Sequence, residues 1–166
     1  MLLYLIGLPG AGKTATGRKL AKEKHYPFID LDAYIEEKEK KTIKNIFGSE
    51  GEDSFRRLEN KYLKEVATLP EAVIATGGGT PCFYDNIHVI KQTGKSVFLN
   101  PSLAHIAQRI AQQEAIRPMF QTRDEKVILA KLEQLYLARE PFYLKADLIT
   151  ITTDLHKLVK QILSYF

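Results

Sequence analysis

The sequence predicts a single three-layer α/β domain in which a parallel β-sheet lies between two layers of helices. Apolar runs of strand character alternate with helical patterns along all 166 residues, an order typical of parallel sheets with helices on both faces. Two of the runs, 72–75 and 97–99, are continuously apolar, as expected for strands buried on both faces. The length suits one domain, and no long linker or repeat divides it.

The predicted elements alternate along the chain. Strands are expected at 2–6, 27–30, 72–76, 96–100 and 147–152. Helices are expected at 13–23, 33–40, 54–68, 85–92, 102–112, 125–139 and 155–165. Ser54 follows a glycine-rich stretch and precedes a helical run, which predicts a helix start, and Pro141 predicts the end of the helix that carries Arg139.

The composition is ordinary for a soluble globular protein, with 45% hydrophobic residues, 27% charged residues and a formal net charge of +4. Its scattered lysines favour a solvated surface over a nucleic-acid interface. Cys82 is the only cysteine, which excludes disulfides and cysteine metal sites, and the four histidines lack ligand spacing. No apolar run is long enough to span a bilayer, and the first strand starts at residue 2, so we expect a cytoplasmic protein without membrane or nucleic-acid partners.

A glycine-rich loop follows the first strand directly. Its pattern is Gly7-x-x-x-x-Gly12-Lys13-Thr14, and a helical stretch comes next. This is the P-loop pattern in its required context of strand, loop and helix, in which backbone N–H groups and the helix N-terminus bind phosphate. Lys13 can reach the β- and γ-phosphates, and the Thr14 hydroxyl can ligate Mg²⁺. A plain turn joining strand to helix is the simpler alternative.

The same letters also fit a second motif. Gly10-Ala-Gly-Lys-Thr-Ala15 matches G-x-G-x-x-A, and Asp30 and Asp32 lie about where a ribose-binding acid would sit in a dinucleotide-binding oxidoreductase. We disfavour this interpretation because the strand ends at Gly7, which leaves the loop too long for the tight turn of that motif. It would also give Lys13 and Thr14 no role.

The second strand ends in Asp30-Leu-Asp32, two acids on one side of an extended backbone. One can hold Mg²⁺ through water, and the other can accept a proton from a substrate hydroxyl. The third strand ends in glycines rather than an acid, which assigns the metal role to Asp30. Alternatively, Asp32 only caps the helix predicted to begin at Ala33.

The third strand is followed by Gly77-Gly78-Gly79, which suits a backbone that approaches a ligand closely, although a tight turn alone would also explain it. We interpret Cys82, just beyond, as a packing residue rather than a nucleophile.

Several arginines suggest an anionic ligand. Arg56 and Glu59 share one helix face, which predicts either a binding arginine held by its acid or a solvated ion pair. Arg139 is either a binding residue or a favourable charge at a helix C-terminus. Arg117, followed by Pro118, is expected in a mobile connection where it could close on the γ-phosphate, unless it is an ordinary loop charge. Arg109 could lie over an adenine ring.

Together the P-loop, the two acids and the lid arginine predict ATP-dependent phosphoryl transfer. Arg56, Arg139 and the glycine turn exceed what ATP needs, and a guanidinium suits a carboxylate held by two bonds. The acceptor is therefore expected to be a small anion with a hydroxyl group.

These motifs also resemble those of the shikimate kinases. The resemblance runs from residue 2 to about residue 143 and rests on the P-loop, Asp30-Leu-Asp32, Gly51-Glu-x-x-Phe55-Arg56-x-x-Glu59, the triple glycine, Arg117-Pro118 and Arg139-x-Pro141-x-Tyr143. It implies the nucleoside monophosphate kinase fold, with five parallel strands in the order 2-3-1-4-5, a substrate-binding region at about 31–62 and a lid at about 112–125. It also implies transfer of the ATP γ-phosphoryl group to the 3-hydroxyl of shikimate, on the pathway to chorismate and aromatic amino acids.

The resemblance also implies roles for individual residues. Those for ATP are Gly10, Ala11, Gly12, Lys13, Thr14, Ala15, Arg109, Arg117 and Thr153. Those for shikimate are Asp32, Phe47, Phe55, Arg56, Glu59, Gly77, Gly78, Gly79 and Arg139. Lys13, Asp32 and Arg117 are the expected catalytic residues, and Thr14 and Asp30 the expected Mg²⁺ residues.

The chain departs from the family pattern in places. Family members often have a glycine where this chain has Lys40-Lys41-Thr42, which we expect to alter only a helix end. Residues 109–117 are hard to align, so Arg109 is one candidate for stacking on adenine, and Thr153 is placed by position alone. Other interpretations are a kinase for another small acceptor such as gluconate or a nucleoside monophosphate, and a nucleotide-binding module without catalysis. A monomer is expected.

Overall fold

The computed structural model describes residues 1–114 and 119–166. Its centre is one five-stranded, all-parallel sheet in the order β2-β3-β1-β4-β5, which confirms the predicted fold class and strand order. The strands are β1 (Leu2–Ile6), β2 (Phe28–Asp30), β3 (Ala72–Ala75), β4 (Gly94–Leu99) and β5 (Leu148–Thr150). In the central strand, Leu2 pairs with Ala72 of β3 on one side and with Gly94 of β4 on the other.

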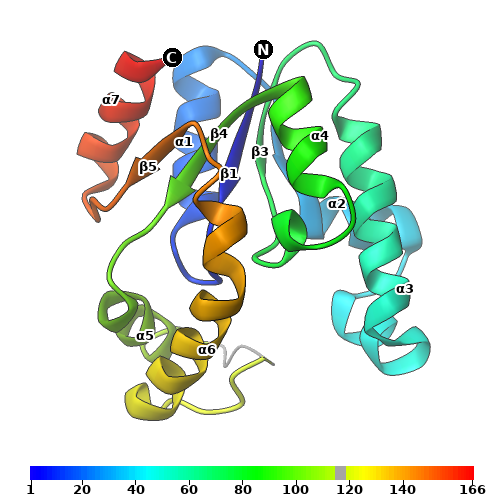
Figure 1. The fold of residues 1–166 in the computed structure, drawn as a ribbon, viewed down its shortest axis with the longest axis vertical. Helices are drawn as coiled ribbons and strands as arrows, with labels where there is room; N and C mark the ends of the chain where they lie inside the picture. The colour runs from blue at the N-terminus through cyan, green and yellow to red at the C-terminus, as the bar shows by residue number, and fades with distance from the viewer. Residues whose placement is uncertain (115–118) are drawn as a thin grey trace.

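Helices cover both faces of the sheet (Figure 1). They are α1 (Lys13–Lys24), α2 (Leu31–Glu39), α3 (Ile43–Val66), α4 (Asn86–Thr93), α5 (Leu103–Ala111), α6 (Glu125–Tyr143) and α7 (Leu155–Tyr165), with a short 3₁₀ turn, η1 (Thr80–Cys82). Helices α1 and α7 pack together on one face, and α4 lies against the other. Helix α5, with part of α6, and the lower part of α3 extend past the carboxyl ends of the strands on opposite sides of the molecule.

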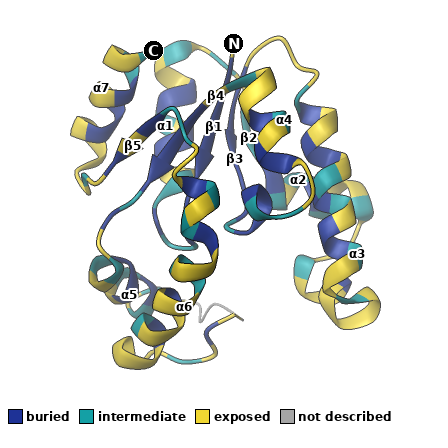
Figure 2. Cartoon of the chain, viewed as in Figure 1, coloured by how far each residue is buried: buried dark blue, intermediate teal, exposed yellow. Residues whose placement is uncertain are grey.

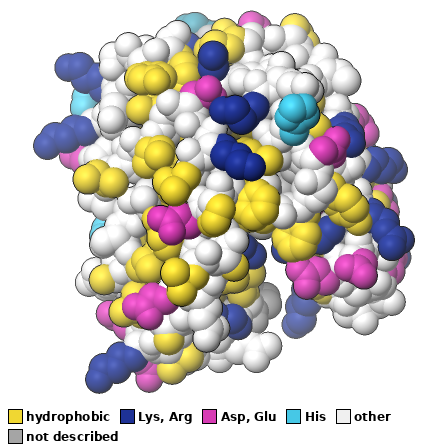
Figure 3. All heavy atoms as spheres, in the orientation of Figure 1, with side chains coloured by type: hydrophobic (Ala, Val, Ile, Leu, Met, Phe, Trp, Pro, Cys, Tyr) yellow, Lys and Arg dark blue, Asp and Glu magenta, His cyan; other side chains and the backbone are white. Residues whose placement is uncertain are grey.

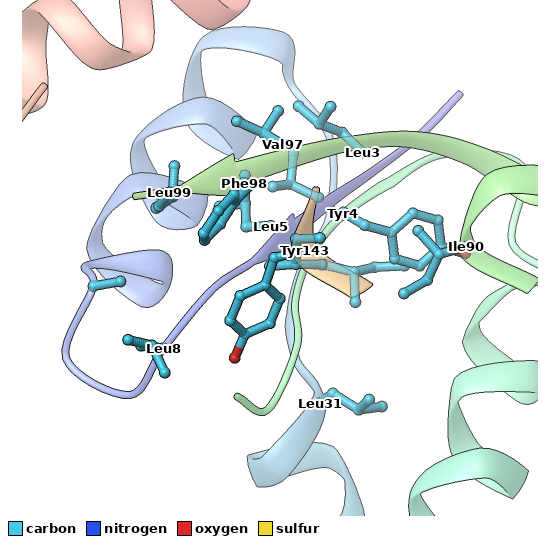
Figure 4. Close-up of a cluster of buried hydrophobic side chains, with 14 of the residues drawn as sticks. Leu3, Tyr4, Leu5, Leu8, Leu31, Ile90, Val97, Phe98, Leu99 and Tyr143 are labelled. Carbon is cyan, nitrogen blue, oxygen red and sulfur yellow. The ribbon is translucent and has the colours of Figure 1, made fainter. Parts of the chain in front are cut away.

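The core is built on the central strands. Every residue of β1 is buried, as are those of β3, which accounts for their continuously apolar sequences (Figure 2). Tyr4 is fully buried, and its hydroxyl forms a hydrogen bond of 2.8 Å with the Thr93 hydroxyl. From α6, Tyr143 packs on Phe98 of β4 with ring centroids 4.8 Å apart, as Figure 4 shows. The core thus fixes α6 against the sheet.

Helix α3 differs most from the sequence prediction. It begins at Ile43, where the Thr42 side chain accepts a hydrogen bond from the Asn45 N–H, so the helix predicted to start at Ser54 lacks the first segment of α3. Gly51 has φ +84° inside the element, so two helical segments meet at a kink that a glycine accommodates. The residues around Ser54 look like a helix start because the backbone does break there, but helix continues on both sides.

Two other helix ends also differ. Helix α2 begins at Leu31, with Asp30 as its N-cap. It ends at Glu39, and its C-cap residue Lys40 has φ +55°. This left-handed conformation favours glycine, so the departure from the family pattern lies at a helix end, as expected. Helix α6 runs past Pro141 to Tyr143, so the predicted end is wrong. The proline removes one helical hydrogen bond, to the carbonyl of Leu137, and Leu137 is an exposed residue.

Among the residues that the structure describes, none of the helices combines the length and the apolar character needed to cross a bilayer.

Candidate active site

A cavity of about 1100 Å³ lies at the carboxyl ends of the strands, where parallel α/β sheets bind their ligands. Figure 3 shows the molecule hollowed between the lobe formed by α5 and α6 and the lobe formed by α3. Most of the predicted site residues line this cavity: Gly10, Gly12, Lys13, Thr14, Ala15, Asp30, Asp32, Phe47, Phe55, Arg56, Glu59, Gly77, Gly78, Gly79, Arg109 and Arg139. The fold therefore brings two distant sets of residues, one for each predicted substrate, into one space.

The P-loop forms one wall. Gly10 and Gly12 have φ values of +82° and +96°, which glycine adopts without strain. The Lys13 ammonium donates to the carbonyls of Gly7 and Leu8 at 2.8 and 2.9 Å. A side chain at Gly12 would meet the Arg109 guanidinium at 3.3 Å, so Arg109 reaches over the loop. The loop opens into the N-terminus of α1, whose partial positive charge favours phosphate.

Asp30 lies beside this loop. One of its carboxylate oxygens accepts a hydrogen bond of 2.9 Å from the Thr14 hydroxyl. The other accepts from the Ala33 N–H at 3.4 Å and caps α2. The alternative in which Asp32 caps this helix is therefore wrong, because the helix starts two residues earlier than predicted. Because Asp30 caps the helix, the Asp32 side chain is not needed for capping, and it lines the cavity.

Asp32 is held in an environment that disfavours its charge. Its Oδ1 atom is buried and has no hydrogen-bond partner among the described residues. Burial, and next the negative charges of Glu59 and Asp30, raise its pKa from 3.8 to about 6, while Lys13 and Arg56 oppose the shift. A carboxylate with a pKa near working pH is suited to accept a proton.

This shift predicts a cost in stability. Because folding raises the pKa of Asp32 from 3.8 to about 6, the free energy of unfolding falls as pH rises through that window. At pH 7.5 we expect Asp32→Asn to raise the free energy of unfolding by about 1–3 kcal/mol. The gain should disappear at pH 4, where the native carboxyl is protonated. Urea melts at both pH values measure it, and a variant less stable than the native chain at pH 7.5 would contradict the burial argument.

Arg56 and Glu59 form a buried pair on α3. Their side chains join at 2.9 Å, and Glu59 is fully buried while Arg56 is 7% exposed. The more exposed Glu52 lies 3.4 Å from the same guanidinium. The solvated ion pair considered from the sequence is therefore wrong, and the burial arises because α3 packs against the glycine turn.

The glycine turn is packed against charged side chains. A side chain at Gly79 would lie 2.6 Å from the Arg56 guanidinium, and one at Gly78 would lie 2.9 Å from that of Arg139. At Gly77 it would meet oxygens of Asp32 and Glu59 at 2.9 and 3.0 Å. Close approach therefore explains all three glycines better than a turn does, since only Gly lets the side chains of α2, α3 and α6 meet there.

Arg139 is buried on α6, and its Nη1 atom has no hydrogen-bond partner in the described part of the chain. A buried donor without a partner is costly, which makes this atom a candidate for contact with a ligand.

The sequence motifs did not assign a role to Tyr143, which lies one turn after Arg139 on α6. Its hydroxyl donates to the Gly78 carbonyl at 2.5 Å, so it fixes the glycine turn against α6. In the sequence, the motif Arg139-x-Pro141-x-Tyr143 was the feature that could have indicated a role for this tyrosine.

Phe47 and Phe55 line the cavity near Arg56, with their ring centroids 4.8 Å apart. Phe55 is buried, while Phe47 is 38% exposed at the cavity edge. They give the site an apolar wall.

Some predicted residues lie elsewhere. Arg117 is outside the described residues. Thr153 lines a second hollow of about 680 Å³, which is formed with the start of α5. Ala11 is buried and donates its N–H within the loop, to Leu8. Cys82 is half-buried, and burial raises the pKa of its thiol to about 11, in agreement with a packing role.

Across residues 1–114 and 119–166, no group of three or more His, Cys, Asp or Glu side chains is arranged to hold a metal ion. The Thr14–Asp30 pair still suits a magnesium ion that is bound mainly by phosphate and water.

Comparison with known proteins agrees with this geometry. The family model for shikimate kinase matches residues 9–166. A shikimate kinase of Bacteroides thetaiotaomicron is 44% identical over 89% of this chain and 84% of its own. A crystal structure of shikimate kinase from that organism has a TM-score of 0.94 at 37% identity, covering 99% of this chain and 97% of its own. A structure of a shikimate kinase from Acinetobacter baumannii in complex with shikimate has a TM-score of 0.89 at 35% identity. The match covers 99% of this chain and 91% of that one.

These matches confirm the family and the kinase activity that the motifs predicted, and they favour the P-loop interpretation over the dinucleotide motif. By sequence and by fold, the chain belongs to the shikimate kinase family.

Proposed function

We propose that this chain transfers the γ-phosphoryl group of ATP to the 3-hydroxyl of shikimate. The supporting observation is a complementary pair of buried atoms, Arg139 Nη1 and Asp32 Oδ1, neither with a protein partner among the described residues, in the cavity that the P-loop also lines. Buried polar atoms normally have partners. A guanidinium donor suits the substrate carboxylate, and a carboxylate oxygen suits a substrate hydroxyl.

The substrate would be oriented from two sides. Arg139 and Arg56 bind its carboxylate, while Asp32 accepts a hydrogen bond from a ring hydroxyl. Glu59 keeps Arg56 in place through the 2.9 Å ion pair. This arrangement aims the hydroxyl at the P-loop, and holding two reactants in line supplies much of the rate enhancement in phosphoryl transfer.

Charge stabilisation would come from the P-loop. Lys13 lies beside the Gly7 and Leu8 carbonyls and would turn to the β- and γ-phosphates when ATP binds. Phosphoryl transfer passes through a loose transition state with little early proton removal, so Asp32 mainly orients the hydroxyl and takes its proton late. Arg117 would add positive charge on the γ-phosphate, and Arg109 would contact the adenine.

Thr14 and Asp30 would hold Mg²⁺, Thr14 directly and Asp30 through water. This assignment is supported by the 2.9 Å hydrogen bond between the two side chains, which line the cavity beside the P-loop lysine. When bound, the ion neutralises charge on the β- and γ-phosphate oxygens.

The function is tested by ADP release with shikimate, gluconate and AMP as acceptors. We expect turnover with shikimate alone. Turnover only with another acceptor would support the alternative small-molecule kinase, and ATP binding without any turnover would support a nucleotide-binding module. Binding of NAD, followed by nicotinamide fluorescence, would revive the oxidoreductase interpretation.

The pH dependence follows from Asp32. Its pKa of about 6 predicts that kcat/KM for shikimate falls tenfold per pH unit below about pH 6, because a protonated carboxyl cannot accept the hydroxyl proton. The profile is measured at saturating Mg–ATP, with Asp32→Asn as the control that should remove this limb. An unchanged limb in that variant would assign the ionisation to another group.

We also propose a cytoplasmic monomer, since ATP is available in the cytoplasm and the cavity of a single chain already holds groups suited to both substrates. Light scattering of the purified protein tests the oligomeric state.

A further inference from the structure

The segment 79–83, which begins with the last residue of the glycine turn, makes three contacts with the Arg56–Glu59 pair. Gly79 lies against the Arg56 guanidinium, so that a Cβ atom at this position would lie 2.6 Å from Nη1 and would force the guanidinium to shift. The Thr80 hydroxyl donates to Glu59 Oε2 at 2.6 Å, while Glu59 Oε1 accepts from Arg56. The ring of Phe83 lies 4.0 Å from Arg56 Cζ, closer than the ring of Phe55 at 5.2 Å. One short piece of chain therefore touches both members of the pair.

Thr80 is itself held rigidly. It is fully buried, and its N–H donates to the Gly77 carbonyl at 3.2 Å. Its own carbonyl accepts from the buried Asn86 side chain at 2.8 Å, and Asn60 donates to Asn86 at 2.6 Å. A fixed hydroxyl can fix the rotamer of its acceptor, and a bond to a carboxylate is stronger than one between neutral groups.

Phe83 contacts Arg56, the other member of the pair. It is half-buried after η1 and presents its ring to a guanidinium that is 7% exposed. Cation–π attraction strengthens when the cation is desolvated. The other two nitrogens of Arg56, Nε and Nη2, each lie 3.4 Å from the more exposed Glu52. Among the described residues, the Phe83 ring and Glu59 therefore provide its firmest contacts.

We propose that Thr80 and Phe83 are positioning residues for substrate binding. Thr80 orients Glu59, Phe83 covers the Arg56 guanidinium, and together they hold that guanidinium where it meets the carboxylate of the acceptor. Neither residue lines the main cavity, so both act through the Arg56–Glu59 pair. The inference rests on the proposed function, because it assumes that Arg56 binds shikimate.

The test is the kinetics of Thr80→Val, which keeps the shape of the side chain and removes the donor. We expect the KM for shikimate to rise about 10- to 100-fold, the range for a hydrogen bond to a charged group. The KM for ATP should change less than about twofold, because additivity holds for groups without shared partners. Thr80→Ser, which retains the hydroxyl, should restore most of the affinity.

Thr150→Val is the matched control. Thr150 is 3% exposed, and its hydroxyl donates to Gln161 at 2.9 Å. Thr150→Val therefore loses a buried hydroxyl donor, here to a neutral acceptor, away from the glycine turn, and its KM for shikimate should not change. Phe83→Leu is an independent test, with an expected rise of about 3- to 30-fold in that KM.

A double mutant tests whether Thr80 acts through Arg56. In an Arg56→Met background, Thr80→Val should lower kcat/KM for shikimate by less than about twofold further, because coupled residues are not additive. A full additional loss would overturn the proposed route.

The outcomes separate the two proposals. No turnover of shikimate by the native chain would overturn the proposed function. Native turnover with an unchanged KM for shikimate in Thr80→Val, or an equal rise in Thr150→Val, would overturn the positioning role alone. If Thr80→Val does not fold, as judged by circular dichroism, Phe83→Leu decides, and an unchanged KM there overturns the proposal.

Discussion

Replacing Lys13 with alanine is expected to lower kcat by about 10³-fold or more, which is the upper range for losing one preorganised charge-stabilising group. Lys13 lines the cavity at the end of the P-loop and lies against the carbonyls of Gly7 and Leu8. The substitution removes the positive charge that would meet the transferring phosphoryl group, and steady-state ADP release measures the loss.

The control is Lys22→Ala, because Lys22 is an exposed lysine on the same helix, away from the loop. It should retain native kcat. Circular dichroism of Lys13→Ala should show a native fold, since no core residue is changed. A rate within tenfold of native for a folded Lys13→Ala would refute the phosphate assignment.

Replacing Arg139 with methionine should weaken shikimate binding by about 2–5 kcal/mol, or 30-fold to several thousand-fold. The same change should cost less stability than the loss of Arg56, because Arg139 Nη1 is buried without a hydrogen-bond partner among the described residues and burying such a donor is itself unfavourable. The contact that the rest of the guanidinium makes with the Tyr143 side chain would be lost. Isothermal titration with shikimate and thermal melting give the two quantities.

Arg56→Met provides the contrast. It should also weaken shikimate binding, but it leaves the fully buried Glu59 without its 2.9 Å ion-pair partner. Breaking a buried pair in this way destabilises a fold by about 3–5 kcal/mol. Equal stability losses in the two variants would mean that the contact of Arg139 with Tyr143 stabilises the fold as much as the Arg56–Glu59 pair does. Unchanged shikimate affinity in either variant would remove that arginine from the site.

Much of the fold was predictable from local sequence. The strands β1 and β3 and the last three residues of β4 appear as continuous apolar runs because both of their faces are buried. Helix boundaries were less predictable. Gly51 imitates a helix start because it breaks the backbone inside α3, and Pro141 imitates a helix end although α6 continues to Tyr143. Such ends depend on whether the freed backbone groups meet water or protein, which the sequence does not state.

By itself, the sequence determined the P-loop, the alternating elements and the residue types of the acceptor site, because periodicity, glycine spacing and motif order are local properties. Only the tertiary structure decided that Asp30 caps α2 while Asp32 lines the cavity with an unpartnered Oδ1 atom among the described residues. It also decided that Glu59 is buried between Arg56 and Thr80, and that Tyr143 holds the turn at Gly78. The contacts of Glu59 with Thr80 and of Tyr143 with Gly78 join segments far apart in the chain, and they exist only because the sheet and its helices pack in one arrangement.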